Sequence, residues 1–327
     1  MKPSSLSVLI VTYNSQRHIG TLLQTLRAEL AGLDAEVVVV DNASRDGTAD
    51  LVEREHPGVR LLRSTVNLGF AAGNNLAARH ARGELLLLLN PDAVPAPGTI
   101  ARGLALMAAH PEVGLAGARL LDPAGAVQPS ARMFPTLLQE FFVLSGLAAR
   151  FPRSRLFGAL DRRWADPDEP AAVDWVPGAF ALVPRELFER LGGFDERFFL
   201  YYEEVDLCRR ILKAGRRVMY WPELRVQHIG GASARTVEGG AVSRSGAQLT
   251  LWRARSALLY YRKNHGAPTA WAVNRLERGW HLLRSARARL RGPSQSGKRE
   301  ESDHLRGVMR QAWLDTLGGR VAPPRPW

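Results

Sequence analysis

The stretch LLLLLNPDA, residues 85–93, sets five consecutive leucines directly against Asn-Pro-Asp. A run of five apolar residues closed by Asn and Pro is short for a helix and fits a fully buried strand. We therefore expect Asp92 to lie just beyond the end of a buried strand. The strands around it then decide what this carboxylate can bind.

Further short apolar runs alternate with segments that have apolar residues at helical spacing. The expected strands are residues 6–11, 36–41, 59–63, 84–89 and 113–118. The expected helices lie within residues 17–30, 47–55, 71–81 and 97–110. This alternation predicts an α/β fold with a mostly parallel central sheet and helices on both faces.

Ligands of such sheets bind beyond the carboxyl ends of the strands. The residues that follow four of the expected strands are short and polar: Thr12-Tyr13-Asn14, Asp41 to Ser44, Val66 to Gly69, and Asn90-Pro91-Asp92. Taken singly, such residues leave strands because they make turns and helix caps. Their coincidence at one edge of one sheet indicates a ligand site as well.

Three other classes of protein have a sheet of this kind: dinucleotide-binding folds, proteins with a Walker loop, and nucleotidyltransferases. A dinucleotide-binding fold needs Gly-x-Gly-x-x-Gly after its first strand, where this chain has only Gly20, and no Walker loop is present. A nucleotidyltransferase usually carries a basic Gly-rich loop there, which VTYNSQRHIG is not. Without a glycine loop for the phosphates of a nucleotide, a divalent cation on Asp92 would neutralise them.

The charge of the chain is concentrated in its C-terminal part. The 327 residues carry a net charge of +12, but residues 1–240 hold 27 Lys and Arg against 27 Asp and Glu, and residues 241–327 hold 17 against 5. We expect no nucleic-acid partner, because the balanced body lacks base-stacking aromatics and any known binding module. A single cysteine, Cys208, excludes a disulfide framework and indicates a reducing compartment.

Seven blocks in order resemble the inverting glycosyltransferases of family 2, which have the GT-A fold. They are VLIVTYN, VVVVDNASRDGT, NLGFAAGNN, LLLLLNPDA, WVPGAF with the helix after it, FFLYYEEVDLCRRI, and a later His228. The chain is most similar to the rhamnosyltransferase-like branch, over about residues 5–235. The resemblance implies a metal-dependent enzyme that moves a sugar from a nucleotide diphosphate, with dTDP-L-rhamnose favoured and a UDP-sugar as the alternative, to a lipid-linked or polysaccharide acceptor.

The resemblance also implies which residues hold the donor. The first loop and the Asp of VVDN would bind base and ribose, two asparagines of NLGFAAGNN would lie near sugar and diphosphate, and the Asn of Asn-Pro-Asp would contact the sugar or support the metal. These residues are Thr12, Tyr13, Asn14, Asp41, Asn67, Asn74 and Asn90. In the same comparison Asp92 and His228 are metal ligands, for Mg²⁺ or Mn²⁺. A lone His before Gly-Gly is otherwise often structural.

Three acidic residues, Glu203, Glu204 and Asp206, begin an expected helix. The helix dipole alone favours acidic residues there, but crowded carboxylates beside bulky aromatics also raise a pKa, as a catalytic base requires. Helical spacing puts Glu203 and Asp206 on one face and Glu204 on another. By family position Glu204 is the base, with Glu203 as the alternative.

On the acceptor side the resemblance points to Asp174, Trp175 and Gly178. A tryptophan beside a sugar site can stack on an apolar pyranose face, although a tryptophan buried in the core is the commoner case.

We interpret residues 1–235 as the catalytic domain, 236–265 as a connecting loop and helix, and 266–327 as a basic amphipathic helical region. The last region has an apolar stripe flanked by arginines, made of Val273, Leu276, Trp280, Leu283 and Leu290. Such a helix fits an anionic membrane surface, or else it packs on the catalytic domain. Residues 292–303 are expected to form a flexible linker before a last short helix. Because no run is long enough for a membrane span or a signal peptide, we expect a peripheral protein on the cytoplasmic face of the membrane.

Overall fold

The computed structural model describes residues 5–230 and 247–325, and it has a ten-stranded mixed sheet at its centre. The main order is β3-β2-β1-β4-β9-β6-β10-β5, with β7 and β8 paired at its margins. The strands are β1 (Leu6–Thr12), β2 (Ala35–Asn42), β3 (Arg60–Ser64), β4 (Leu85–Leu89), β5 (Ala93–Pro95), β6 (Val113–Leu121), β7 (Val127–Gln128), β8 (Ala171–Ala172), β9 (Phe180–Pro184) and β10 (Arg217–His228). All five expected strands are present, as β1, β2, β3, β4 and β6.

The pairing of the strands is parallel through most of the path. β1 pairs in parallel with β2 and with β4, β2 with β3, and β10 with β6. β9, which was not predicted, lies antiparallel between β4 and β6. The carboxyl ends of β1, β2, β3 and β4 therefore meet at one edge of the sheet, as the sequence predicts.

The leucine run packs against both faces of the sheet. Leu86 and Leu88 belong to one buried cluster, and Leu85, Leu87 and Leu89 belong to the other. This division follows from the alternation of side chains along a strand. Burial of a leucine contributes roughly 2 kcal/mol, so β4 alone supplies about 10 kcal/mol of apolar burial before the entropy of ordering is subtracted.

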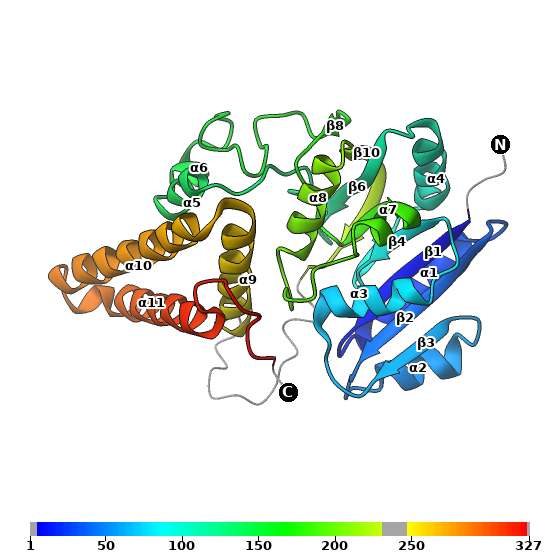
Figure 1. Ribbon diagram of the computed structural model, residues 1–327, viewed down its shortest axis with the longest axis horizontal. Helices are drawn as coiled ribbons and strands as arrows, with labels where there is room; N and C mark the ends of the chain where they lie inside the picture. Colours follow the sequence, from blue (N-terminus) through cyan, green and yellow to red (C-terminus); the bar gives the residue numbers. More distant parts are fainter. Residues whose placement is uncertain (1–4, 231–246, 326–327) are drawn as a thin grey trace.

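Four helices in the first half lie where they were expected: α1 (Gln16–Glu29), α2 (Thr48–Glu55), α3 (Gly69–Arg79) and α4 (Thr99–Ala109). Two more were also predicted. α7 (Arg185–Arg190) follows Pro184 and ends before Gly192, and α8 (Glu203–Lys213) begins with the acidic residues. Figure 1 shows how α3, α7 and α8 lie around the sheet. The small helices α5 (Leu137–Leu144) and α6 (Leu147–Arg150) were not predicted, although Thr136 and Gln139 form a capping box at the start of α5.

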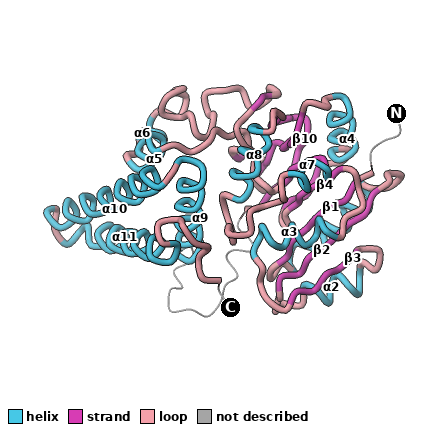
Figure 2. Tube along the Cα trace, viewed as in Figure 1, coloured by secondary structure: helices cyan, strands magenta, loops and turns pink. Residues whose placement is uncertain are grey.

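Three long helices follow the sheet: α9 (Ala247–His265), α10 (Ala267–Leu290) and α11 (Ser296–Thr316). A short 3₁₀ turn, η2 (Pro293–Gln295), joins the last two. Figures 1 and 2 show α10 and α11 running side by side away from the sheet, with α5 and α6 beside α10. None of the helices in the described ranges is long and apolar enough to cross a bilayer.

The prediction of a flexible linker at residues 292–303 is wrong, because most of this segment is the first part of α11. The polar composition of the segment hides contacts that only the folded pair of helices makes. Arg284 pairs with Glu301 at 2.9 Å, and Ser285 Oγ donates to Asp303 Oδ1 at 2.8 Å. These contacts with α10 stabilise a helix that its own sequence only weakly favours.

The apolar stripe expected on α10 divides between two environments. Val273 is buried in the same cluster as Leu86 and Leu88, and so are Tyr260 and Tyr261 of α9. Leu283 and Leu290, farther along α10, are exposed. The first part of the helix therefore packs on the catalytic core through Val273, although Trp271 is exposed there, and the far part exposes Leu283 and Leu290.

Candidate active site

The ends of β1 and β2 are joined by a network around Asp41. The hydroxyl of Thr12 donates to Asp41 Oδ1 at 2.9 Å, and the backbone N–H of Ser44 donates to Asp41 Oδ2 at 3.0 Å. Thr12 is fully buried, so its part is to hold the carboxylate of Asp41 rather than to touch a ligand.

The loop after β1 is held by its neighbour after β2. Asn14 has φ 48°, in the left-handed region, and its side chain accepts a hydrogen bond from the backbone N–H of Arg45 at 2.8 Å. Its own N–H donates to Ser44 Oγ at 2.9 Å. Tyr13, the residue before Asn14, is half-buried. This arrangement places the phenol of Tyr13 after the end of β1 and the buried carboxylate of Asp41 at the end of β2.

The asparagines near α3 have structural partners. Asn67 Oδ1 accepts from the N–H of Gly69 at 3.0 Å, which starts the helix. Asn74 is buried, and its amide donates to the carbonyl of Phe70 at 2.9 Å. Asn75, which sequence reasoning missed, donates to the carbonyl of Phe194 and accepts from its N–H, both at 2.9 Å. We infer that Asn74 and Asn75 support the site and do not line it.

His228 lies beside both Asn90 and Asp92, although 138 residues of sequence separate it from Asn90. His228 Nε2 is 3.6 Å from Asp92 Oδ1 and 3.4 Å from the amide nitrogen of Asn90. His228 is the last residue of β10, which pairs there with Ala93 of β5. The short antiparallel β5 after Asn-Pro-Asp is thus the element that brings His228 to Asp92.

Gln128 of β7 holds the imidazole of His228 at two points. Gln128 Oε1 lies 3.0 Å from His228 Nδ1, and its amide donates to the His228 carbonyl at 2.8 Å. With the Nδ1 proton donated to Gln128, Nε2 is left as the unprotonated nitrogen on the side of Asp92. Burial lowers the pKa of His228, while Asp92 opposes this shift, so the ring favours the neutral form that binds metals.

Asp92 and His228 could supply two of the ligands of a divalent cation. A carboxylate oxygen and an oriented imidazole nitrogen suit Mn²⁺ or Mg²⁺, and both lie at the strand ends. No group of three or more His, Cys, Asp or Glu that could hold a metal occurs among the described residues. Oxygens from a bound diphosphate are the ligands that would complete such a site.

The acidic pair at the start of α8 follows a strained turn. Tyr201 and Tyr202 have φ 70° and 67°, in a region that bulky residues rarely adopt. Packing and a hydrogen bond from Ser256 Oγ of α9 to the carbonyl of Leu200, at 2.8 Å, hold the segment. The turn directs Glu204 into a cavity instead of into solvent.

Glu203 and Glu204 each have one buried carboxylate oxygen, Oε2, without a hydrogen-bond partner among the described residues. Burial raises the pKa of Glu204 to about 6, and it raises the pKa of Glu203 well above its usual range, with the neighbouring Glu204 adding to that shift. Buried, unpartnered carboxylates with raised pKa values are typical of catalytic groups.

The two glutamates differ in access. Glu204 lines a cavity of about 560 Å³, and Glu203 does not. Asp206 has a structural role, since it accepts hydrogen bonds from Arg210 and Lys263, both at 2.8 Å. The geometry thus favours Glu204 over Glu203 as the group that can meet a substrate.

The acceptor-side residues surround this cavity unevenly. Trp175 lines it, and the indole N–H donates to the carbonyl of Met133 at 2.9 Å. Asp174 accepts from the N–H of Phe134 at 2.7 Å and so fixes the neighbouring segment. Gly178 is buried, and a Cβ there would lie 2.9 Å from the ring of Phe70, so its role is close packing.

The segment that carries Trp175 joins the two halves of the site. Trp175 and Pro177 line the cavity of Glu204, and two residues later the carbonyl of Ala179 accepts from the N–H of Asn90 at 3.1 Å. The Asp92 side and the Glu204 side therefore adjoin across one short stretch of backbone.

The far wall of the cavity contains residues that sequence reasoning missed. They come from the segment before α5, from α5 itself and from α9, and they are Arg132, Glu140, Leu249, Thr250 and Arg253. Glu140 accepts a hydrogen bond from the hydroxyl of Tyr261 at 2.8 Å. The only signal for these residues in the sequence is that charged side chains, such as Glu140 and Arg253, stand within otherwise apolar segments.

Comparisons with known proteins agree with this geometry. Residues 7–191 match the family described as Glycosyl transferase family 2. The chain is 34% identical over 235 residues to N-acetylglucosaminyl-diphospho-decaprenol L-rhamnosyltransferase of Mycobacterium tuberculosis, a match that covers 68% of this chain and 75% of the relative. It is 25% identical over 233 residues to rhamnosyltransferase WbbL of Escherichia coli K12, over 68% of this chain and 82% of that one.

A solved structure with a similar fold is the mannosyltransferase PcManGT of Pyrobaculum calidifontis in complex with GDP-Man and Mn²⁺. The TM-score is 0.55 at 21% identity, over 95% of this chain and 88% of the other. GalNAc-T7 with UDP, GalNAc and Mn²⁺ has a TM-score of 0.54 at 16% identity, over 98% and 59% of the chains. These likenesses establish the GT-A fold. Together with the family match, they show that the chain is a glycosyltransferase of glycan synthesis and belongs to glycosyl transferase family 2, in its rhamnosyltransferase-like branch.

Proposed function

We propose that this chain transfers L-rhamnose from dTDP-L-rhamnose to a hydroxyl of a lipid-linked or polysaccharide acceptor, with inversion at the anomeric carbon. The observation that carries the reaction type is the carboxylate of Glu204, which lines a cavity and has one oxygen, Oε2, without a hydrogen-bond partner among the described residues. The names of the two rhamnosyltransferases that the chain resembles support the donor and, for the mycobacterial relative, a lipid-diphosphate acceptor. A UDP-sugar is the alternative donor.

In the proposed reaction Glu204 takes the proton of the acceptor hydroxyl. The hydroxyl oxygen forms a bond to the anomeric carbon, and the bond from that carbon to the nucleoside diphosphate breaks with its electron pair. A carboxylate with a pKa of about 6 is a suitable base near neutral pH, because it is ionised there and still holds a proton readily.

The donor is proposed to lie across the ends of β1, β2 and β4. Asp41 offers carboxylate oxygens to the base or ribose, and Tyr13 and Asn14 border the same place. Asn67 and Asn90 remain candidates for contacts with the sugar or the diphosphate. Asp92 and His228 would hold a divalent cation, which would stabilise the negative charge on the departing diphosphate.

We further propose a peripheral position on the cytoplasmic face of the membrane, where an acceptor with a lipid anchor would be presented. The excess of basic residues in the C-terminal part of the chain supports this location.

A panel of nucleotide sugars tests the donor. Purified protein with Mn²⁺ or Mg²⁺ is assayed for thermal shift and for donor hydrolysis with dTDP-rhamnose, UDP-glucose, UDP-N-acetylglucosamine and GDP-mannose. We expect the largest shift and the fastest hydrolysis with dTDP-rhamnose. Stabilisation by UDP-sugars and not by dTDP-rhamnose would refute the rhamnosyl donor, and no response to any donor would refute the transferase proposal for this chain.

A further inference from the structure

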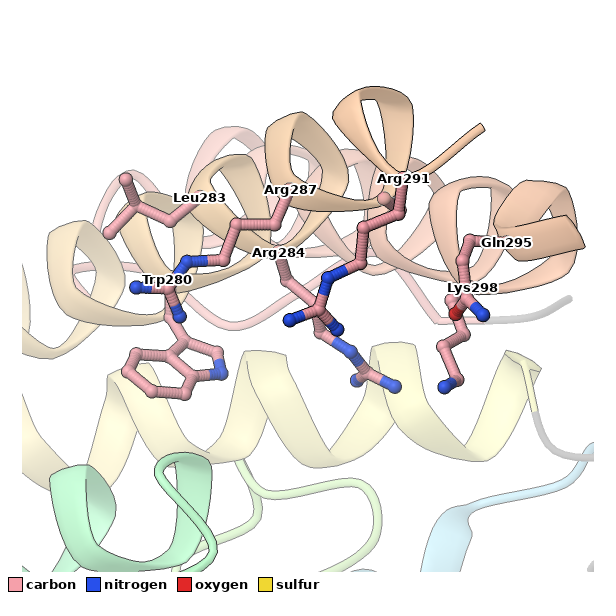
Figure 3. A pocket seen from close by; sticks show the side chains of 8 residues that line it. Trp280, Leu283, Arg284, Arg287, Arg291, Gln295 and Lys298 are labelled. Atoms are coloured by element: carbon pink, nitrogen blue, oxygen red, sulfur yellow. The ribbon is translucent and has the colours of Figure 1, made fainter. Parts of the chain in front are cut away.

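A groove runs along the far part of α10 where that helix meets the start of α11. Its volume is about 310 Å³. Figure 3 shows the side chains that line it, and we call this set of residues the basic groove: Trp280, Leu283, Arg284, Arg287, Ala288, Arg291, Gln295 and Lys298. The cationic groups of the two helices extend to the same side in that view.

The cations of the basic groove are mostly available to a ligand. Arg287, Arg291 and Lys298 are exposed, and none of the three has an ion pair with any residue in the described part of the chain. Arg284 forms an ion pair with Glu301, with 2.9 Å between the guanidinium nitrogen and the carboxylate oxygen. Three uncompensated positive charges around one hollow favour an anionic partner that presents several oxygens.

Apolar side chains border the same groove. Leu283 is 59% exposed and Leu290 is 89% exposed. The ring of Trp280 meets the ring of Phe141 of α5 edge to face, with centroids 6.3 Å apart, and Leu138, one turn before Phe141, is 54% exposed. Leucine, phenylalanine and tryptophan beside arginine are the composition of a surface that enters a bilayer interface.

We propose that the basic groove binds the phosphate headgroups of anionic phospholipids, while Leu283, Leu290 and the exposed edge of α5 enter the interface. This proposal rests on the proposed function, because an acceptor with a lipid anchor is found at a bilayer. A nucleic acid is the less suitable partner, because single strands bind on stacked aromatic rings and the only ring here is half-buried against Phe141.

The position of α5 relates this surface to the reaction site. Phe141 meets the basic groove, and Glu140, the residue before it, lines the cavity that contains Glu204. A bilayer on the groove would therefore lie on the other side of α5 from the cavity of the proposed base.

The chain offers a matched control on another face of the same helices. Arg275, Arg306 and Arg310 line a second groove, and the period of 3.6 residues puts Arg275 about 120° around α10 from Arg287. The test variant is R287Q/R291Q/K298Q, and the control is R275Q/R306Q/R310Q. Both remove three positive charges from α10 and α11, and glutamine keeps a good helix propensity.

Binding is measured by flotation with vesicles of phosphatidylcholine and phosphatidylglycerol at 3:1, with pure phosphatidylcholine as the uncharged reference. We expect the test variant to lose about tenfold or more of its partition onto the anionic vesicles, since each cation near such a surface contributes about fivefold. The control variant should lose threefold or less. Circular dichroism and thermal melting confirm that both variants are folded.

If the two variants lost equal fractions of their partition onto anionic vesicles, the proposal would be wrong, because binding would then depend only on total charge and not on the basic groove. Failure of the wild-type protein to float with anionic vesicles would overturn it as well. So would tighter binding of a fluorescent oligouridine than of vesicles, if the test variant abolished it. The assay uses neither donor nor acceptor, so failure of the lipid proposal and failure of the glycosyl transfer proposal give separate results.

Discussion

At the scale of single residues, the carboxylate of Glu204 is held in a state that favours reaction over stability. Its pKa in the folded protein is about 6, above the usual value of 4.5, because burial disfavours the charged form. The folded state therefore binds the proton more tightly than the unfolded chain. This contribution to stability is complete below about pH 4.5 and is lost as the pH rises through 6.

Glu204→Gln should abolish the base and relieve this cost. We expect kcat to fall by about a hundredfold or more, while the melting temperature above pH 6 rises by an amount that corresponds to on the order of 1 kcal/mol. The gain should vanish near pH 4. The measurements are turnover and thermal melting across pH 4 to 8, and in the wild type turnover should fall as the pH drops below 6.

Glu203→Gln is the control, since this side chain is buried and does not line the cavity. It should keep turnover within about tenfold of the wild type. A larger loss from Glu203→Gln than from Glu204→Gln would exchange the roles of the two residues.

Gln128 is expected to act as a positioning residue through His228. Gln128→Leu removes both hydrogen bonds to the histidine, and Gln128→Glu keeps an oxygen for Nδ1. Because such partners orient the imidazole, Mn²⁺ affinity in the presence of excess dTDP should fall about 10- to 100-fold in Gln128→Leu and much less in Gln128→Glu. Free Mn²⁺ is followed by electron paramagnetic resonance. Equal affinity in both variants would show that the contact does not orient the ligand.

At the scale of elements, the start of α3 is pressed against the segment that leads to α8. Gly69 has φ 83°, and a Cβ there would lie 2.4 Å from the carbonyl oxygen of Phe199. Gly98, before α4, has φ 78° but open space around it. The two glycines therefore separate the cost of backbone strain from the cost of a steric clash.

Gly98→Ala should lower the free energy of unfolding by about 1 kcal/mol, because only the left-handed backbone is penalised. Gly69→Ala should lower it by about 3 kcal/mol or more, because the backbone around Phe199 must also move. Urea denaturation measures both. Similar values for the two would mean that α3 is not closely packed on this segment.

The sequence predicted those elements whose own pattern is sufficient. The five strands found from apolar runs all belong to the sheet, four of them largely buried and β3 at its partly exposed edge, and Pro184 and Gly192 bracket α7 as expected. β9 was missed because FALVP pairs antiparallel with β4 and β6, a choice that its residues do not encode. α11 was misread because contacts with α10 outweigh the polar composition of its first turns.

At the scale of the whole molecule, the C-terminal helices are part of the catalytic core. Ser256 and Tyr260 of α9 bond to the segments around α8, and Arg255 Nε donates to Asp315 Oδ2 of α11 at 2.8 Å. Tyr260, Val273 and Met309 share one buried cluster with the sheet. Removal of α10 and α11 would expose much of this apolar surface.

A chain that ends at His265 should consequently be unstable. Several large buried side chains would be uncovered at roughly 2 kcal/mol each, against a total stability of about 5–15 kcal/mol. We expect a lower melting temperature and aggregation in size-exclusion chromatography. A monomeric, cooperatively melting fragment would contradict this and would show that the helices are only an appendage. Point variants are for this reason the cleaner test of membrane contact.

The candidate site was predictable in its parts and not in its assembly. Strand ends and the resemblance pointed to Asp41, Asp92, His228 and Glu204, whereas the wall of the cavity comes from α5 and α9, far away in sequence. Burial of Glu277, together with the neighbouring charge of Glu140, raises the pKa of Glu277 to about 8, while Arg253 opposes this shift. No local sequence pattern predicts that these three residues lie together. Which residues form the wall of the cavity depends on contacts between segments that are far apart in sequence.

The short helix α5 has one further consequence. Glu140 lines the reaction cavity and Phe141 contacts Trp280 of α10. If the proposed membrane contact and the proposed base are correct, this helix would set the distance between Glu204 and the bilayer. An acceptor whose free hydroxyl stood much closer to its lipid anchor, or much farther from it, would then not reach Glu204, so the length of the glycan would matter more than the structure of the lipid.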